Sequence, residues 1–183
     1  PATQEAILRP VCLPRPVVPC RWCRERQPAF EDIRAPFLFQ GAIKTAVYEF
    51  KDRGVKAAAP QLAQLLANYL KSHPLAGHMI IPVPLDPRRL KGRGYNQSAV
   101  LAKELAKVTG IEVESRLLKR TKDELSQVHT ASKNQRRDNV AGSFSCSHNL
   151  SGKSVILIDD IATTGSTLSA CASALKDSGA ASV

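Results

Sequence analysis

The sequence of 183 residues has no apolar run near the roughly 18 residues that a membrane-spanning helix needs. Aromatic residues make up only 5% of it, too few for a surface that stacks the bases of single-stranded nucleic acid. A secretory signal begins with a charged segment followed by an apolar one, and the sequence does not start with this pattern. We therefore expect a cytoplasmic protein without membrane insertion. Because the first residue is Pro1 rather than Met, we also expect a fragment of a longer chain.

Charge is abundant and uneven. Lysine and arginine exceed aspartate and glutamate by 10, and residues 88–137 contain 13 basic and 5 acidic residues, a net charge of +8. Such a stretch attracts phosphates, either on a small ligand or on nucleic acid. The alternative is a solvated basic face with no ligand.

Apolar periodicity predicts strands that alternate with helices, and therefore a mainly parallel sheet with helices on both faces. Hydrophobic residues make up 43% of the chain, enough for one α/β domain with a core. Residues 120–139 are polar with weak periodicity, as expected of a mobile excursion. We predict strands at 35–41, in the run HMIIPVPL (78–85) as far as Pro82 to Pro84, at 112–118 and at 155–158. We predict helices at 43–50, from Pro60 onward, after a cap at Asn96, and at 166–176. The apolar stripe of the helix from Pro60 is Leu62, Leu65, Leu66, Tyr69 and Leu70.

The stretch VILIDDIATTGST, residues 155–167, places two carboxylates at the end of a buried strand. Ligands of open parallel sheets bind beyond the carboxyl ends of the strands. The turn that follows would direct backbone N–H groups and the positive end of a helix dipole into one volume, which suits a phosphate. Gly165 permits close approach, and four hydroxyls add donors, while Asp159 and Asp160 could accept hydrogen bonds from sugar hydroxyls. The residues of this predicted sugar-phosphate site are Asp159, Asp160, Ala162, Thr163, Thr164, Gly165, Ser166 and Thr167.

A simpler interpretation of the same stretch is structural. Asp159 and Asp160 would then be favourable charges near a helix N-terminus, and TTGST an ordinary turn. The combination of both features on one buried strand favours the ligand site.

VILIDDIATTGST resembles the phosphoribosyl-pyrophosphate signature of the type I phosphoribosyltransferase fold. The resemblance implies that the turn binds the 5′-phosphate and that the acidic pair holds the ribose 2′- and 3′-hydroxyls. It also implies Mg²⁺, coordinated largely by oxygens of the ligand, as this ion prefers.

A second segment, IPVPLDPRRLKGRGYNQSAVLAKELA, carries four cationic side chains and a glycine turn after a strand, which could receive a pyrophosphate or be a basic surface loop. It resembles the PVPL…R…RG(F/Y)NQ…LA pattern of the ComF family of competence proteins, which are related to amidophosphoribosyltransferases. The resemblance covers about residues 35–183. It implies that the loop faces the pyrophosphate through Leu85, Arg88, Arg93 and Gly94.

Residues 117–144 resemble a third segment of the ComF pattern, which in this fold is a mobile hood over the ligand. A closing hood would shield the ribosyl centre from water. The hood candidates are Arg120, Thr121, Gln127, Arg136 and Asn139, although Arg136 and Asn139 could equally be packing or surface residues.

The five cysteines are an odd number, and Cys20 and Cys23 have the spacing of half a zinc site. Many ComF-like proteins carry an N-terminal module with four cysteines that binds zinc. Here Arg9 stands where a partner of Cys12 is expected. We predict Zn²⁺ at Cys12, Cys20 and Cys23, with a fourth ligand that is upstream, a residue other than Cys, or absent; the alternative is a decayed module.

The sequence thus predicts two units: a small irregular Cys-containing module at residues 1–34, and a type I phosphoribosyltransferase-like domain at 35–183, with a mainly parallel sheet flanked by helices. The expected function is binding of phosphoribosyl pyrophosphate with Mg²⁺, with transfer of the phosphoribosyl group to a nitrogen nucleophile and a role in DNA uptake. The alternatives are a non-catalytic protein that handles single-stranded DNA and a conventional salvage or synthesis enzyme. Candidate partners are the pyrophosphate ligand, single-stranded DNA, proteins of the DNA-uptake machinery and a second copy of the chain in a homodimer.

Overall fold

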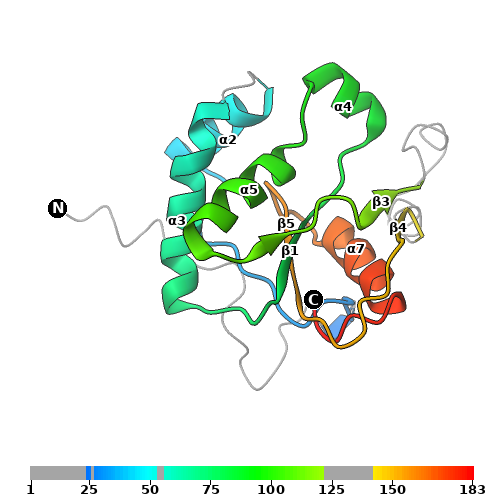
Figure 1. Cartoon of the computed structure of the whole chain (residues 1–183). Helices are drawn as coiled ribbons and strands as arrows, with labels where there is room; N and C mark the ends of the chain where they lie inside the picture. Colours follow the sequence, from blue (N-terminus) through cyan, green and yellow to red (C-terminus); the bar gives the residue numbers. More distant parts are fainter. Residues whose placement is uncertain (1–23, 26, 53–55, 122–141) are drawn as a thin grey trace.

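The computed structural model describes residues 24–25, 27–52, 56–121 and 142–183. Three parallel strands form its central sheet in the order β2-β1-β5 (Figure 1). β1 spans Met79–Pro82, β2 spans Glu112–Val113 and β5 spans Val155–Ile158. β1 pairs with β5 from Met79↔Val155 to Pro82↔Ile158, so both strands end at the same edge of the sheet. The expected mainly parallel sheet is confirmed.

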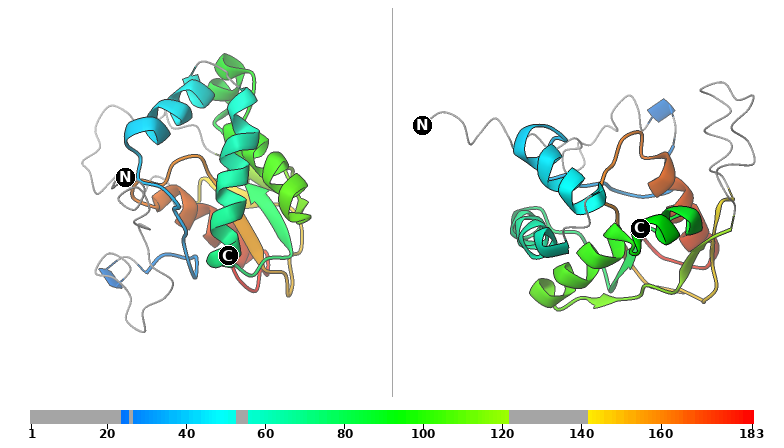
Figure 2. Two further views of the ribbon diagram at one scale, coloured as in Figure 1. Left: turned by 90° about the vertical axis from the view of Figure 1, so that its left-hand side faces the viewer. Right: turned by 90° about the horizontal axis from the view of Figure 1, so that it is seen from above.

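Helices cover both faces of the sheet (Figures 1 and 2). On one face α3 (Ala59–Ser72) and α5 (Gln97–Thr109) pack against Ile80, Ile156 and Ile158. On the other, α7 (Ser166–Asp177) packs against Ile81 and Val155. Neighbouring residues of one strand thus enter opposite cores, because successive side chains of a strand alternate between faces.

The remaining described elements lie around this sandwich. α2 (Gly41–Asp52) and the 3₁₀ turn η2 (Lys56–Ala58) precede α3, and the helix α4 (Pro87–Arg93) connects β1 with α5. β3 (Leu118–Arg120) and β4 (Phe144–Cys146) form a separate antiparallel pair. The segment before α2 packs on the domain as well, since Phe30 is in the core around α7 and Ala29 N donates to Ser169 Oγ at 3.1 Å.

Several predicted elements need correction. Residues 35–41 form no strand, and 112–118 splits into β2 and the start of β3. In α3, Leu65 is exposed, while Ala59, Ala63 and Ala67 are the buried residues. Small side chains are buried there because α3 lies against α5, where the core includes Leu101, Ala102 and Leu105. α4 was expected as a loop, although Asp86 caps it and Pro87 opens it.

Candidate functional site

The acidic pair follows β5 directly and is held from α5. Ser98, in the first turn of α5, donates its hydroxyl hydrogen to Asp159 Oδ1 at 2.9 Å. The backbone N–H of Asp160 donates to the same oxygen at 2.9 Å. Asp159 is therefore oriented by a residue 61 positions away in the chain.

Asp159 has a strongly perturbed acidity. Burial, and after it the adjacent charge of Asp160, together raise its pKa from the ordinary 3.8 to about 6. The hydrogen bond from Ser98 opposes this rise, because it stabilises the charged form. A carboxyl group kept out of water at such cost is typical of a functional site.

A cation faces the other carboxylate. Lys51 Nζ, in the last turn of α2, lies 3.4 Å from Asp160 Oδ2. This oxygen is buried and accepts no hydrogen bond from the described residues. A buried acceptor without a donor is unusual in a folded protein and marks a candidate position for a donor supplied by a ligand. Sequence reasoning missed both Lys51 and Ser98, and no local signal marks either.

The GYNQS segment, residues 94–98, connects the pieces of the site. The Tyr95 hydroxyl donates to the carbonyl oxygen of Phe50, and Gln97 Nε2 donates to that of Lys51 at 3.2 Å. Asn96 caps α5 and donates from Nδ2 to the Val83 carbonyl oxygen at 2.9 Å. These contacts join the end of α2, the loop after β1 and the acidic pair. The residues predicted to face pyrophosphate precede these three side chains, which bond to the protein itself.

The predicted phosphate turn lies between the acidic pair and α7. Ala162, Thr163 and Thr164 are exposed, and Gly165 has a φ of +69° at the N-cap of α7. Glycine supplies no side chain to cap the helix, and the Ser166 N–H makes a long hydrogen bond of 3.4 Å to Thr164 Oγ1, so this helix N-terminus is only weakly capped and can receive an anion. The Thr164 and Ser166 hydroxyls are 2.9 Å apart, and Thr167 follows in the first turn, half-buried.

The basic segment leaves the sheet beside the acidic pair. Val83 N donates to the carbonyl oxygen of Ile158 at 2.9 Å, so the loops after β1 and β5 begin as neighbours. Leu85 is half-buried at the start of this connection. Arg88 is exposed on α4 and Arg93 half-buried at its end, with Gly94 at a φ of +76° as the C-cap. The structure thus places these predicted pyrophosphate residues on and around a short helix.

Two hood candidates lie at the base of the β3–β4 pair. The Arg120 guanidinium lies over the Phe144 ring, 5.3 Å from its centroid. Thr121 bonds through its backbone N–H to Ser143 O at 2.8 Å and through its hydroxyl to Gly142 O at 3.2 Å. Both residues hold the ends of the segment between these strands together. The other hood candidates lie outside the described residues: Gln127, Arg136 and Asn139.

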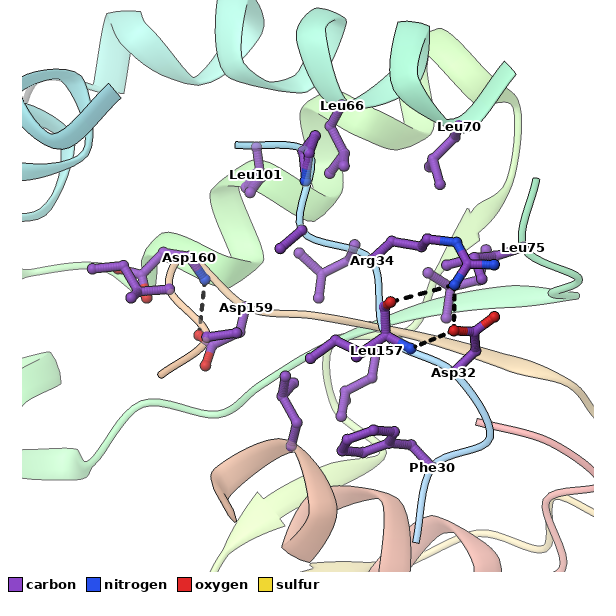
Figure 3. Close-up of a pocket in the computed structure, with 18 of the residues that line it drawn as sticks. Phe30, Asp32, Arg34, Leu66, Leu70, Leu75, Leu101, Leu157, Asp159 and Asp160 are labelled. Carbon is purple, nitrogen blue, oxygen red and sulfur yellow. Dashed lines mark hydrogen bonds and ion pairs between the residues drawn. The ribbon is translucent and has the colours of Figure 1, made fainter. Parts of the chain in front are cut away.

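A pocket of about 470 Å³ lies along β5 (Figure 3). Asp159 and Asp160 are at one end of it, and at the other Arg34 contacts the carboxylate of Asp32. Its apolar lining explains why Asp159 is poorly hydrated. The labelled apolar residues of Figure 3 that line it are Phe30, Leu66, Leu70, Leu75, Leu101 and Leu157.

The predicted zinc ligands Cys12, Cys20 and Cys23 lie outside the described residues, so zinc stays a prediction. Within the described ranges, no group of three or more His, Cys, Asp or Glu side chains could hold a metal ion. Cys146 and Cys171 are free thiols, and burial raises the pKa of the Cys171 thiol. Of the helices in the described part, none is both long and apolar enough to cross a membrane.

A half-buried acidic pair and a glycine-containing turn at a helix N-terminus lie together at the carboxyl edge of a parallel sheet, the arrangement expected of a phosphoribosyltransferase-like protein. The phosphoribosyl transferase domain family matches residues 95–183. This range contains α5 with Ser98, the acidic pair and the turn that leads into α7. The glutamine phosphoribosylpyrophosphate amidotransferase of B. subtilis is similar in structure, with a TM-score of 0.47 and 23% identity over 69% of this chain and 25% of that one.

Curated relatives identify the family more closely. The DNA utilization protein YhgH of Salmonella typhi is 30% identical over 189 residues, 98% of this chain and 82% of the relative. Its Escherichia coli (strain K12) namesake is 28% identical, over 91% and 75% of the two chains. Competence protein F of Haemophilus influenzae is 29% identical, over 87% and 73%. The chain belongs to the ComF family, as expected from its motifs.

Proposed function

We propose that this protein binds phosphoribosyl pyrophosphate with Mg²⁺ at the carboxyl ends of β1 and β5. The observation that carries the proposal is the half-buried Asp159–Asp160 pair, which is contacted by Ser98 and Lys51 and is followed by a short turn to the N-terminus of α7. In this proposal the two carboxylates accept the ribose hydroxyls. The amide and hydroxyl groups of residues 162–167 bind the 5′-phosphate.

The donor set fits a ligand that brings its own magnesium. Asp160 Oδ2 is a buried oxygen that can accept a hydroxyl group, and the described residues offer no cage of three or more metal ligands. Mg²⁺ prefers phosphate oxygens and its own waters to such a cage. When bound, the ion would neutralise charge on the departing pyrophosphate. Arg88 and Arg93 would face that group from α4.

Transfer would break the bond between the anomeric carbon and pyrophosphate, while a nitrogen nucleophile forms a bond to the same carbon and releases a proton to water or to the departing pyrophosphate. The protein groups named above would position the ligand and stabilise charge, which are the usual contributions to such a reaction. The relatives named for competence and DNA utilization support a role of this protein in DNA uptake. The expected cytoplasmic location stays a prediction.

Titration calorimetry with phosphoribosyl pyrophosphate and Mg²⁺ tests the binding proposal. We expect saturable binding by the unaltered protein and its loss in the double variant Asp159→Asn/Asp160→Asn. Asp177→Asn is a matched control, because this exposed carboxylate ends α7 at the far end from the turn. Absence of binding by the unaltered protein, or equal binding by the double variant, contradicts the proposal.

A second candidate function is handling of single-stranded DNA without catalysis. It is supported by the exposed basic side chains Arg88, Arg89 and Lys91 on α4 and by the names of the relatives. Binding through phosphate contacts should weaken steeply with salt. We expect fluorescence anisotropy with a labelled oligonucleotide to show this slope, and a reduced slope after Arg89→Gln. Undetectable binding at low salt would refute this function.

A further inference from the structure

Lys51 lies next to the acidic pair, although it belongs to none of the sequence motifs that predicted the site. Its ammonium nitrogen lies 3.4 Å from Asp160 Oδ2, and the side chains are 24% and 12% exposed respectively. An ion pair this sheltered from water is less screened than one on the surface. It lies at the site and not on an outer face, so it acts on the carboxylate that the ligand would meet.

The protein holds Lys51 in place through its backbone. Gln97 Nε2 donates to its carbonyl oxygen at 3.2 Å, and the Tyr95 hydroxyl donates to the carbonyl oxygen of Phe50 just before it. Tyr95 is buried and Gln97 is almost fully buried. The end of α2 is thus attached to the start of α5, where Ser98 orients Asp159. One short segment therefore fixes the supports of both carboxylates.

Two adjacent carboxylates repel each other, and this repulsion grows where burial removes water. Ser98 supplies Asp159 with one donor, and Asp159 takes a second from the backbone of Asp160. Asp160 Oδ2 receives no hydrogen bond from the described residues and has the Lys51 ammonium as its ion partner. Without Lys51, this carboxylate would be free to turn away from its neighbour.

We propose that Lys51 is a positioning residue of this site, whose ammonium group holds the Asp160 carboxylate where it accepts a ribose hydroxyl. The inference rests on the proposed function and names one further residue that the site needs. It gives the site its preference for a sugar phosphate over a bare phosphate. Lys51 acts on the hydroxyl side of the ligand, and the turn at residues 162–167 acts on the phosphate side.

Two probes distinguish the hydroxyl-binding part of the site from the phosphate-binding part. Ribose 5-phosphate has the sugar hydroxyls, and inorganic phosphate lacks them. Both contain one phosphorus atom, so ³¹P NMR titrations give their affinities under the same conditions. We expect Lys51→Met to weaken ribose 5-phosphate binding about tenfold and to leave inorganic phosphate within about twofold. Lys51→Arg should restore most of the lost affinity, because it keeps the charge.

Lys44→Met is the matched control, since Lys44 is an exposed lysine of the same helix and contacts the Tyr48 ring, not the acidic pair. Equal weakening of both probes by Lys51→Met would overturn the proposal, because Lys51 would then be a general phosphate attractor or a fold determinant. Unchanged or tighter ribose 5-phosphate binding would also overturn it. If the unaltered protein bound neither probe, the role proposed for Lys51 would fall, whereas the proposed function is decided separately by the calorimetry with phosphoribosyl pyrophosphate and Mg²⁺.

Discussion

Replacing Asp159 with asparagine should stabilise the fold at pH 8 while it removes ligand binding. The pKa of Asp159 rises from 3.8 to about 6, first because of burial and then because of the charge of Asp160. At about 1.36 kcal/mol for each unit of pKa, the ionised carboxylate costs the native state about 3 kcal/mol. Asparagine has nearly the same size and can still accept the hydrogen bond from Ser98, but as a neutral, weaker acceptor. We therefore expect a net gain of about 1–2 kcal/mol in the free energy of unfolding.

The gain should depend on pH in one direction. Because the native pKa is above the unfolded one, the native protein keeps its proton between these values when the unfolded chain has lost it. The stability that this proton contributes is fully present below about pH 4 and is lost as the pH rises through about 6. Asparagine has no proton to lose, so the difference between variant and unaltered protein should be near zero at pH 4 and complete at pH 8.

Urea titrations at pH 4 and pH 8 measure this difference as a shift of the unfolding midpoint. Asp177→Asn, at the exposed end of α7, should show no such dependence of stability on pH, because this carboxylate is not shielded from water. The reasoning is refuted if Asp159→Asn is less stable than the unaltered protein at pH 8, or if the two differ equally at both pH values. Titration calorimetry on the same samples would show whether the variant that gains stability also loses binding of phosphoribosyl pyrophosphate.

Two further changes test the supports of the site. Ser98→Ala removes the hydroxyl that donates to Asp159, so the pKa of Asp159 should rise further, and binding of phosphoribosyl pyrophosphate should weaken more at pH 6 than at pH 8 when both are measured by calorimetry. Equal weakening at both pH values would contradict this role of Ser98. Gly165→Ala places a Cβ at a φ of +69°, which costs about 1 kcal/mol in a thermal or urea unfolding measurement and should distort the phosphate turn. Gly92→Ala is its control, because Gly92 lies within α4 with open space around its Cβ position and should be neutral or slightly stabilising.

Much of the fold follows from local sequence patterns. β5 and α7 were predicted nearly to their ends, because an apolar strand, a polar turn and an amphipathic helix follow one another without interruption. The cap of α5 at Asn96 was predicted from the side chain that makes it. α4 was missed although Asp86 and Pro87 are a known helix start, since the run of arginines suggested a loop. The strand expected at 35–41 was wrong because extended, apolar residues need a neighbouring strand, and none pairs with them in the described part of the chain.

The candidate site also has a part that the sequence predicts and a part that only the tertiary structure sets. The acidic pair and its turn are one continuous stretch, so the sequence by itself determined their order and their place at the end of a strand. Only the tertiary structure decided that Asp159 is largely shielded from water, that Ser98 donates to it, and that Lys51 faces Asp160. These contacts join α2, α5 and the end of β5, which are far apart in the chain. They depend on how α5 packs on the sheet and how the end of α2 is attached to the start of α5. Neither the spacing nor the chemistry of neighbouring residues contains that information.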